Sequence, residues 1–307
     1  MRDPNENKLK IWQMACLTAP IAHRASGMPW NEVLIAALLA AGISGLFQEN
    51  RKTIPWLRRL VLLTAAGQGL LSMSGCWPGQ RDMNWVMGIL LILAVLMTWK
   101  NRESTIRSGI LLWWLTAFLF GSVLLSAIPE MERNNLRPYW GKKPGQSVMD
   151  LLGILILPAL MEEKHSVNGT AGIRLILSPL LFSLCSVGVI GKNMGEIRAP
   201  FYELSRSIRL YGLLDRMEGL AWLGLMIGTV LYLSFLMEGL LQRGEQNREG
   251  KTILGAAAAA AISILLKKSE LPVSAILTMA CTIAEYLYEK LHFRSLQKKM
   301  QEIEKRC

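Results

Sequence analysis

The chain has 307 residues, of which 51% are hydrophobic and 19% charged, and its mean hydropathy is +0.30. This balance excludes an ordinary soluble enzyme, in which charge is interleaved with apolar residues throughout the sequence. The net charge of +11 is gathered in short clusters between uncharged runs. Such clusters are typical of membrane-protein loops rather than of a basic nucleic-acid-binding stripe, so we predict a polytopic membrane protein that binds no nucleic acid.

Residues of the types that bind metals or act in catalysis are scattered along the sequence. Five cysteines and three histidines occur singly, without a CxxC pair or the spacing of metal ligands. No nucleophile with a base, and no paired carboxylates, stand out in the apolar runs. We therefore expect no metal, no cofactor and no enzymatic activity.

Ten apolar segments follow one another along the chain as candidate membrane-spanning helices. They cover residues 11–22, 33–47, 60–77, 83–99, 108–129, 151–161, 175–191, 219–237, 252–266 and 271–288. The first and the sixth are too short for a regular crossing, and they contain Pro20 and, in the sixth, Gly153 and Pro158. We expect these two helices to be broken or shortened.

One membrane domain accounts for the whole sequence, with residues 1–10 before its transmembrane body, 11–288, and an amphipathic tail, 289–307, after it. When the ten segments alternate between the two sides, most of the 34 Lys and Arg residues fall on the side of both termini. Both termini are therefore predicted to be cytoplasmic. The tail either lies on an anionic leaflet, docks a partner helix, or continues the last helix into solvent.

The first and sixth segments occupy equivalent positions in two sets of five. This pattern predicts a five-plus-five inverted repeat, in which broken helices expose backbone groups to a substrate at the membrane midplane. Alternatively, the two segments are re-entrant, or their ends are more polar than the count of uncharged residues tolerates. The candidate ligand-binding residues are Thr18, Ala19 and Pro20 in the first segment, and Leu152, Gly153 and Ile154 in the sixth.

Charged residues at the spacing of helical neighbours precede the eighth segment. The candidate lid residues are Glu203, Arg206, Arg209, Arg216 and Glu218. They are too numerous to enter lipid unpaired, so they predict a surface or lid segment. An ion-paired interfacial helix without a gating role is the alternative.

Glu285 is the strongest candidate for an acid within the membrane, because an apolar run precedes it. Intramembrane carboxylates usually face the protein interior. The alternative is that Glu285 snorkels toward the membrane surface, where Lys290 lies within about one turn of the helix.

Short motifs occur at residues 135–141, at 157–160 and between Pro200 and Glu218. Together they resemble the permease-like B subunit of bacterial spore germinant receptors, a family of the amino acid/polyamine/organocation transporter superfamily. The sequence NLRPYWG at 135–141 resembles that family's "NL.P…G" loop, and LPAL at 157–160 matches the segment after its sixth span. The family's "P..E..R…R.E" signature before a late helix resembles Pro200, Glu203, Arg206, Arg216 and Glu218.

The resemblance implies an all-α, LeuT-like fold and a lid formed by the charged segment. It also implies that a small germinant such as an amino acid binds between segments one, three, six and eight. The implied partners are a soluble-domain A-type subunit and a lipoprotein C-type subunit, in the spore inner membrane. Two alternatives stay open: a non-binding scaffold subunit of a membrane complex, and a secondary transporter of an amino acid or cation.

Overall fold

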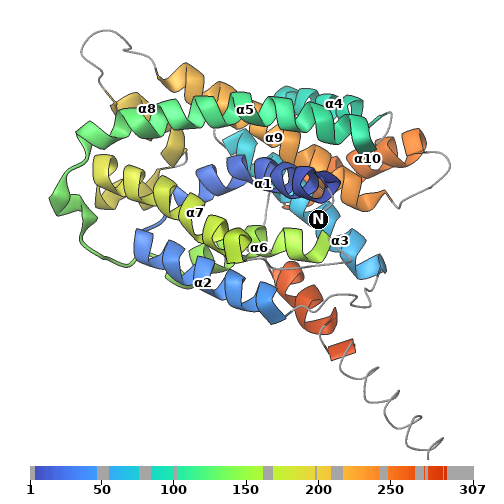
Figure 1. Cartoon of the computed structure of the whole chain (residues 1–307), viewed down its shortest axis with the longest axis horizontal. Helices are drawn as coiled ribbons and strands as arrows, with labels where there is room; N and C mark the ends of the chain where they lie inside the picture. Colours follow the sequence, from blue (N-terminus) through green and yellow to red (C-terminus); the bar gives the residue numbers. More distant parts are fainter. Residues whose placement is uncertain are drawn as a thin grey trace, which may run out of the picture.

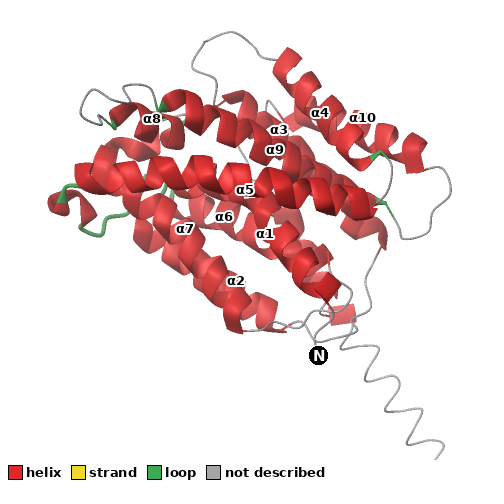
Figure 2. Cartoon of the chain, turned by 45° about the horizontal axis from the view of Figure 1, so that its top comes forward, coloured by secondary structure: helices red, strands yellow, loops and turns green. Residues whose placement is uncertain are grey.

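The structure is a computed structural model that describes residues 4–46, 55–75, 84–99, 102–161, 169–197, 199–208, 217–241, 248–266, 273, 276–285, 287 and 288. Within these ranges the chain forms α-helices and short 3₁₀ turns and no strand, as Figure 2 shows. The predicted tail 289–307 lies outside the described residues.

Except for α8, the α-helices overlap the apolar segments of the sequence. Their bounds are α1 Pro4–Ala25, α2 Trp30–Leu46, α3 Pro55–Gly75, α4 Asn84–Thr98, α5 Arg102–Ala127, α6 Pro144–Met161, α7 Gly169–Ile190, α8 Pro200–Ser207, α9 Glu218–Leu240 and α10 Arg248–Leu266. The 3₁₀ turns are η1 Ile128–Glu130, η2 Arg133–Leu136 and η3 Lys192–Glu196. Helix Ile276–Glu285 lies within the tenth predicted segment, whereas α8 falls between the seventh and the eighth.

Three helical stretches are long and apolar enough to cross a membrane: Arg102–Glu130, Glu218–Leu240 and Glu249–Leu266. In the most apolar part of Glu218–Leu240, 72% of the residues are buried, against 28% in Arg102–Glu130. The helix α9 is therefore central in the bundle and α5 is peripheral. This distribution gives the protein the character of a membrane protein, because its peripheral helix is as apolar as its central one.

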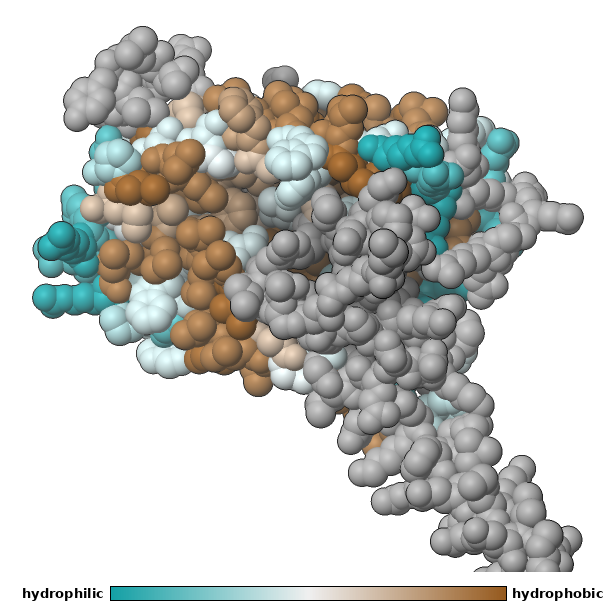
Figure 3. All heavy atoms as spheres, in the orientation of Figure 1, coloured by the Kyte–Doolittle hydropathy of each residue, from teal (hydrophilic) through white to brown (hydrophobic). Residues whose placement is uncertain are grey.

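An apolar stripe on α5 shows what surrounds the bundle. Leu111, Trp114, Phe118 and Leu125 are 66–72% exposed and recur at helical spacing, so they share one outward face. Figure 3 shows hydrophobic side chains across the middle of the molecule and hydrophilic ones gathered at two opposite ends. A continuous exposed apolar surface of this kind is suited to lipid rather than to water.

The helix α1 runs through the middle of the bundle (Figure 1). It packs against α6 and α7 on one side and against α9 and α5 on the other. The helices α6 and α7 both pack on α2, and α3, α4 and α10 form a second group with α9. As a result α1 lies at the boundary between two groups of helices.

The first and sixth helices were expected to be broken or shortened, and the expected break is wrong, although the apolar part of α6, Pro144–Pro158, is among the shorter apolar helices. Both α1 and α6 are continuous, with Pro20 and Pro158 inside them, and α1 starts well before the uncharged run. A proline inside a helix removes one N–H donor, and in a packed membrane helix neighbouring groups compensate for that loss. Gly153 is likewise helical, because a glycine weakens a helix without terminating it.

The loop between η1 and α6, which contains the NLRPYWG motif, is fastened to the start of α2. The Gly141 N–H donates to Glu32 Oε1 at 2.6 Å, and Trp30 Nε1 donates to the Leu136 carbonyl at 3.0 Å. Burial, together with the nearby Glu32 carboxylate, raises the pKa of Tyr139 in this loop. These contacts fix the point from which α6 enters the bundle.

The α1–α9 contact depends on small side chains. A Cβ atom added to Gly228 would lie 2.5 Å from the Ala19 Cβ, so the two helices approach as closely as glycine permits. Small residues at such crossings allow helices in membranes to gain van der Waals contact. This close contact sets the spacing between α1 and α9.

We predict that Gly228→Leu lowers the free energy of unfolding by about 1–3 kcal/mol, because the larger side chain forces α1 and α9 apart. The matched control is Gly219→Leu on the same helix, where an added Cβ meets nothing within 4 Å. Denaturant unfolding of the purified protein in detergent micelles measures both variants. Equal stability of the two variants would contradict the close α1–α9 contact.

Candidate ligand-binding cavity

A cavity of about 40 Å³ lies where α1, α3, α6 and α9 meet. These helices correspond to the first, third, sixth and eighth apolar segments. The lining residues are Pro20, His23 and Arg24 from α1, Ala65, Gln68, Gly69 and Ser72 from α3, Asp150 and Ile154 from α6, and Thr229 and Tyr232 from α9. The cavity is therefore a polar site inside a largely apolar bundle.

An ion pair joins two walls of the cavity. Arg24 Nη1 lies 3.5 Å from Asp150 Oδ2, which connects α1 to α6, and Arg24 Nη2 donates to Ser72 Oγ on α3 at 3.2 Å. The Asp150 side chain is 13% exposed and that of Arg24 is 31% exposed. A carboxylate this deeply buried needs a nearby cation, because burial without one costs several kcal/mol.

The second oxygen of Asp150 is left over. Within the described part of the chain, Oδ1 is buried and makes no hydrogen bond, although the Gln68 side chain hydrogen-bonds to the same carboxyl group. An unsatisfied buried acceptor costs about 1–3 kcal/mol, so a water molecule or a ligand donor is expected to bind it. The cavity holds an unused acceptor beside an Arg guanidinium, which has donors for a carboxylate.

The two charges make the cavity suitable for a ligand that carries both signs. An ammonium group would bind Asp150 Oδ1, and a carboxylate would bind Arg24. The present volume of about 40 Å³ holds one to a few water molecules, since a single water needs only about 10–15 Å³. A ligand larger than that requires the walls to move.

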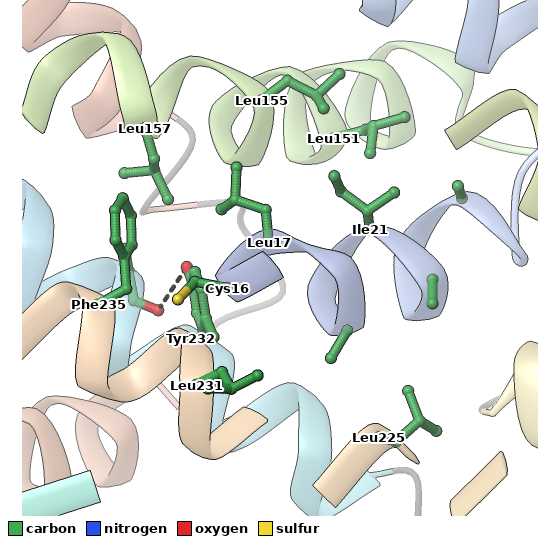
Figure 4. Packing of buried hydrophobic residues seen from close by; sticks show 14 of the residues in the cluster. Cys16, Leu17, Ile21, Leu151, Leu155, Leu157, Leu225, Leu231, Tyr232 and Phe235 are labelled. Atoms are coloured by element: carbon green, nitrogen blue, oxygen red, sulfur yellow. Dashed lines mark hydrogen bonds between the residues drawn. The ribbon is translucent and has the colours of Figure 1, made fainter. Parts of the chain in front are cut away.

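An apolar interface between α1 and α6 flanks the polar cavity. Figure 4 shows Leu17 and Ile21 of α1 pointing toward Leu151 and Leu155 of α6. All four side chains are buried. Packing here is provided by side chains, so the space between the two helices is largely filled apart from the cavity itself.

Two of the six predicted binding residues line the cavity: Pro20 and Ile154. Thr18 does not line it, and Ala19 packs instead against Gly228 on α9. Leu152 and Gly153 are buried away from the cavity. The cavity thus shares one residue on α1 and one on α6 with the predicted set, and whether a ligand binds there stays a prediction.

The charged and polar lining residues were missed. Arg24 follows the first apolar segment and Asp150 directly precedes the sixth, so the two short segments are bordered by charges of opposite sign. Gln68 and Ser72 lie four residues apart in an otherwise apolar run, and this spacing places them on one face of a helix. The opposite charges beside the short segments and the two polar residues four positions apart are the features of the sequence that indicate this cavity.

The predicted lid segment contains the short helix α8. Phe201 on its inner side packs edge-on against Phe120 and Phe182, with ring centroids 5.0 and 5.5 Å away. On the outer side, Arg206 Nη1 lies 3.7 Å from Glu203 Oε1, and both side chains are at least 36% exposed. These two charges therefore interact with each other at the surface and not with the cavity.

Of the remaining predicted site residues, Glu218 is the first residue of α9, and Arg209 and Arg216 lie outside the described residues. Glu285 ends helix Ile276–Glu285 and is only 1% exposed, so its side chain faces protein. It does not line the cavity. Among the described residues, no three His, Cys, Asp or Glu side chains gather as a metal site.

No protein-family model matches the chain, and no curated protein matches it. The fold and the cavity define the class: an all-helical protein, with helices able to cross a membrane, that encloses a small charged cavity.

We predict that Arg24→Met lowers the free energy of unfolding by about 1–3 kcal/mol, because it leaves the buried Asp150 carboxylate without its cation. Adding Asp150→Leu should recover much of that loss, since the stranded charge is then removed. A double-mutant cycle in detergent micelles measures the coupling, which should reach about 0.5–3 kcal/mol. Additive effects of the two substitutions would show that the residues do not interact.

Proposed function

We propose that the chain is a transporter-like membrane protein with ten spanning helices in a five-plus-five inverted repeat, and that it binds a small zwitterion such as an amino acid. The observation that carries this proposal is the Arg24–Asp150 pair in the cavity between α1, α3, α6 and α9. Pockets between the helices of membrane bundles are common ligand sites, and intramembrane charges commonly mark them.

In this proposal the ligand is bound by side chains, and not by the exposed backbone groups that broken helices would have provided. Because α1 and α6 are continuous, almost all of their backbone groups are used within the helices. Pro20 in α1 and Pro158 in α6 are the exceptions within the helices: each lacks an N–H, so neither position supplies an intrahelical donor. Recognition of both charged ends of a zwitterion then depends on Arg24 and Asp150.

The resemblance of the three motifs supports a particular role within this class. The chain acts as the membrane subunit of a spore germinant receptor, with both termini cytoplasmic, and signals to a soluble-domain subunit and a lipoprotein subunit. A ligand in the cavity contacts helices from both packed groups, so it shifts the equilibrium between their relative positions. That shift is the signal passed to the partners.

The helix α8 is placed to respond to the ligand. A Cβ added to Gly27 would lie 3.0 Å from Pro200 Cγ, so the start of α8 packs on the turn that follows α1. Arg24 lies on the last turn of α1, close to this contact. Movement of Arg24 toward a ligand carboxylate would therefore be transmitted to the lid segment.

A non-binding scaffold subunit is the second candidate function. The small volume of the cavity and the apolar packing of α1 on α6 favour it. In this version the Arg24–Asp150 pair only fixes the two helices relative to each other. The two functions differ in one property, which is whether a zwitterion stabilises the folded protein.

We predict that glycine or L-alanine raises the unfolding temperature of the purified protein, because a ligand bound only by the folded state stabilises it by about 2.7 kcal/mol at 100 times its Kd. Glycine methyl ester and N-acetylglycine are the controls, since each lacks one of the two charges. Neither should stabilise the protein. A panel of amino acids that produces no shift would favour the scaffold.

Secondary transport is tested separately. Uptake of labelled glycine into proteoliposomes under a proton or sodium gradient would identify a transporter. A receptor subunit binds glycine in the thermal-shift assay and shows no uptake above that of empty liposomes.

A further inference from the structure

One aromatic side chain determines how wide the cavity is. Tyr232 of α9 lines the cavity and is only 3% exposed. It extends from α9 toward α3, where the Ala65 carbonyl lies near its hydroxyl and Gly69 lies against its ring. Its ring therefore occupies space between α9 and the helices opposite.

The position of the ring depends on a glycine in α3. A Cβ added to Gly69 would lie 2.7 Å from Tyr232 Cε1 and 3.2 Å from its Cδ1. Real Cβ atoms do not approach a ring so closely, so no larger residue at position 69 is compatible with this placement. The Tyr232 ring thus packs directly against the backbone of α3 at Gly69.

Packing holds the ring more than hydrogen bonding does. The Tyr232 hydroxyl lies 3.5 Å from the carbonyl oxygen of Ala65, which is long for a hydrogen bond. The neighbouring lining residue on α9 is Thr229, whose hydroxyl donates to the Leu225 carbonyl within its own helix at 2.7 Å. Bulk, rather than a polar contact, is what Tyr232 contributes to the cavity.

The remaining walls leave little room for a large ligand. Pro20 and Ile154 close the cavity on the α1 and α6 sides. The volume of about 40 Å³ is roughly a quarter of the 150 Å³ that admits benzene in an engineered protein cavity. Even glycine therefore requires the walls to move apart, and each further side-chain carbon requires a larger displacement of the Tyr232 ring.

We propose that Tyr232, seated on Gly69, is the size-determining residue of the cavity and restricts it to the smallest zwitterions, glycine and L-alanine. This inference rests on the proposed function, because it assumes that a zwitterion binds at Arg24 and Asp150. Removing the ring opens space beside the charged pair without touching either charge. Side chains of branched amino acids then fit where the ring was.

The test is calorimetric titration of the full chain in lipid nanodiscs with glycine, L-alanine, L-valine and L-leucine. The wild type should bind glycine at least about tenfold more tightly than L-leucine. Tyr232→Ala should reverse that preference by a similar factor, whereas Tyr232→Phe, which keeps the ring, should retain it. Gly69→Ala should weaken binding of all four, since it displaces the ring.

The outcomes distinguish failure of the size limit set by Tyr232 from failure of the proposed zwitterion binding. Equal affinity of the wild type for glycine and L-leucine, or an unchanged preference in Tyr232→Ala, overturns the size limit and leaves the proposed function standing. No heat of binding from any amino acid, in either the wild type or Tyr232→Phe, overturns the proposed function and the size limit with it. If thermal unfolding shows that Tyr232→Ala does not fold, Tyr232→Leu makes the same comparison.

Discussion

The contact between Arg24 and Asp150 is the interaction on which the rest of the site depends. It joins α1 to α6, the two helices that run beside one another at the boundary between two packed groups. A carboxylate in this position would be too costly to keep ionised without its cation, and the cation in turn binds α3 through Ser72. One arginine therefore links three of the four helices that surround the cavity.

The pair also explains how continuous helices can form a polar site inside a largely apolar bundle. Transporter-like proteins commonly expose backbone groups by interrupting two helices at mid-depth. Here the backbone stays in its helical hydrogen bonds, and charge enters the bundle on side chains near the helix ends. The apolar packing of Leu17 and Ile21 on α6 can then remain intact beside the polar cavity.

Much of the helical fold could be predicted from the sequence, because uncharged runs and their charged borders directly reflect the membrane environment. The continuity of α1 and α6 could not be predicted from the sequence. A proline interrupts a helix only where neighbouring groups do not compensate for the hydrogen bond that it removes. The cavity lies between helices that the sequence analysis named, but within the predicted set Ala19 and Leu152 are packing residues that do not line it. Which face of a helix meets a neighbour depends on tertiary contacts, such as that of Ala19 with Gly228.

The most direct test of the account uses a variant in which the pair is neutralised but packing is kept, Arg24→Met with Asp150→Leu. Glycine is titrated calorimetrically into this variant and into the wild type, both in lipid nanodiscs and both shown to be folded. The account predicts binding to the wild type and none to the folded variant. Equal affinity for glycine in the two proteins would contradict it.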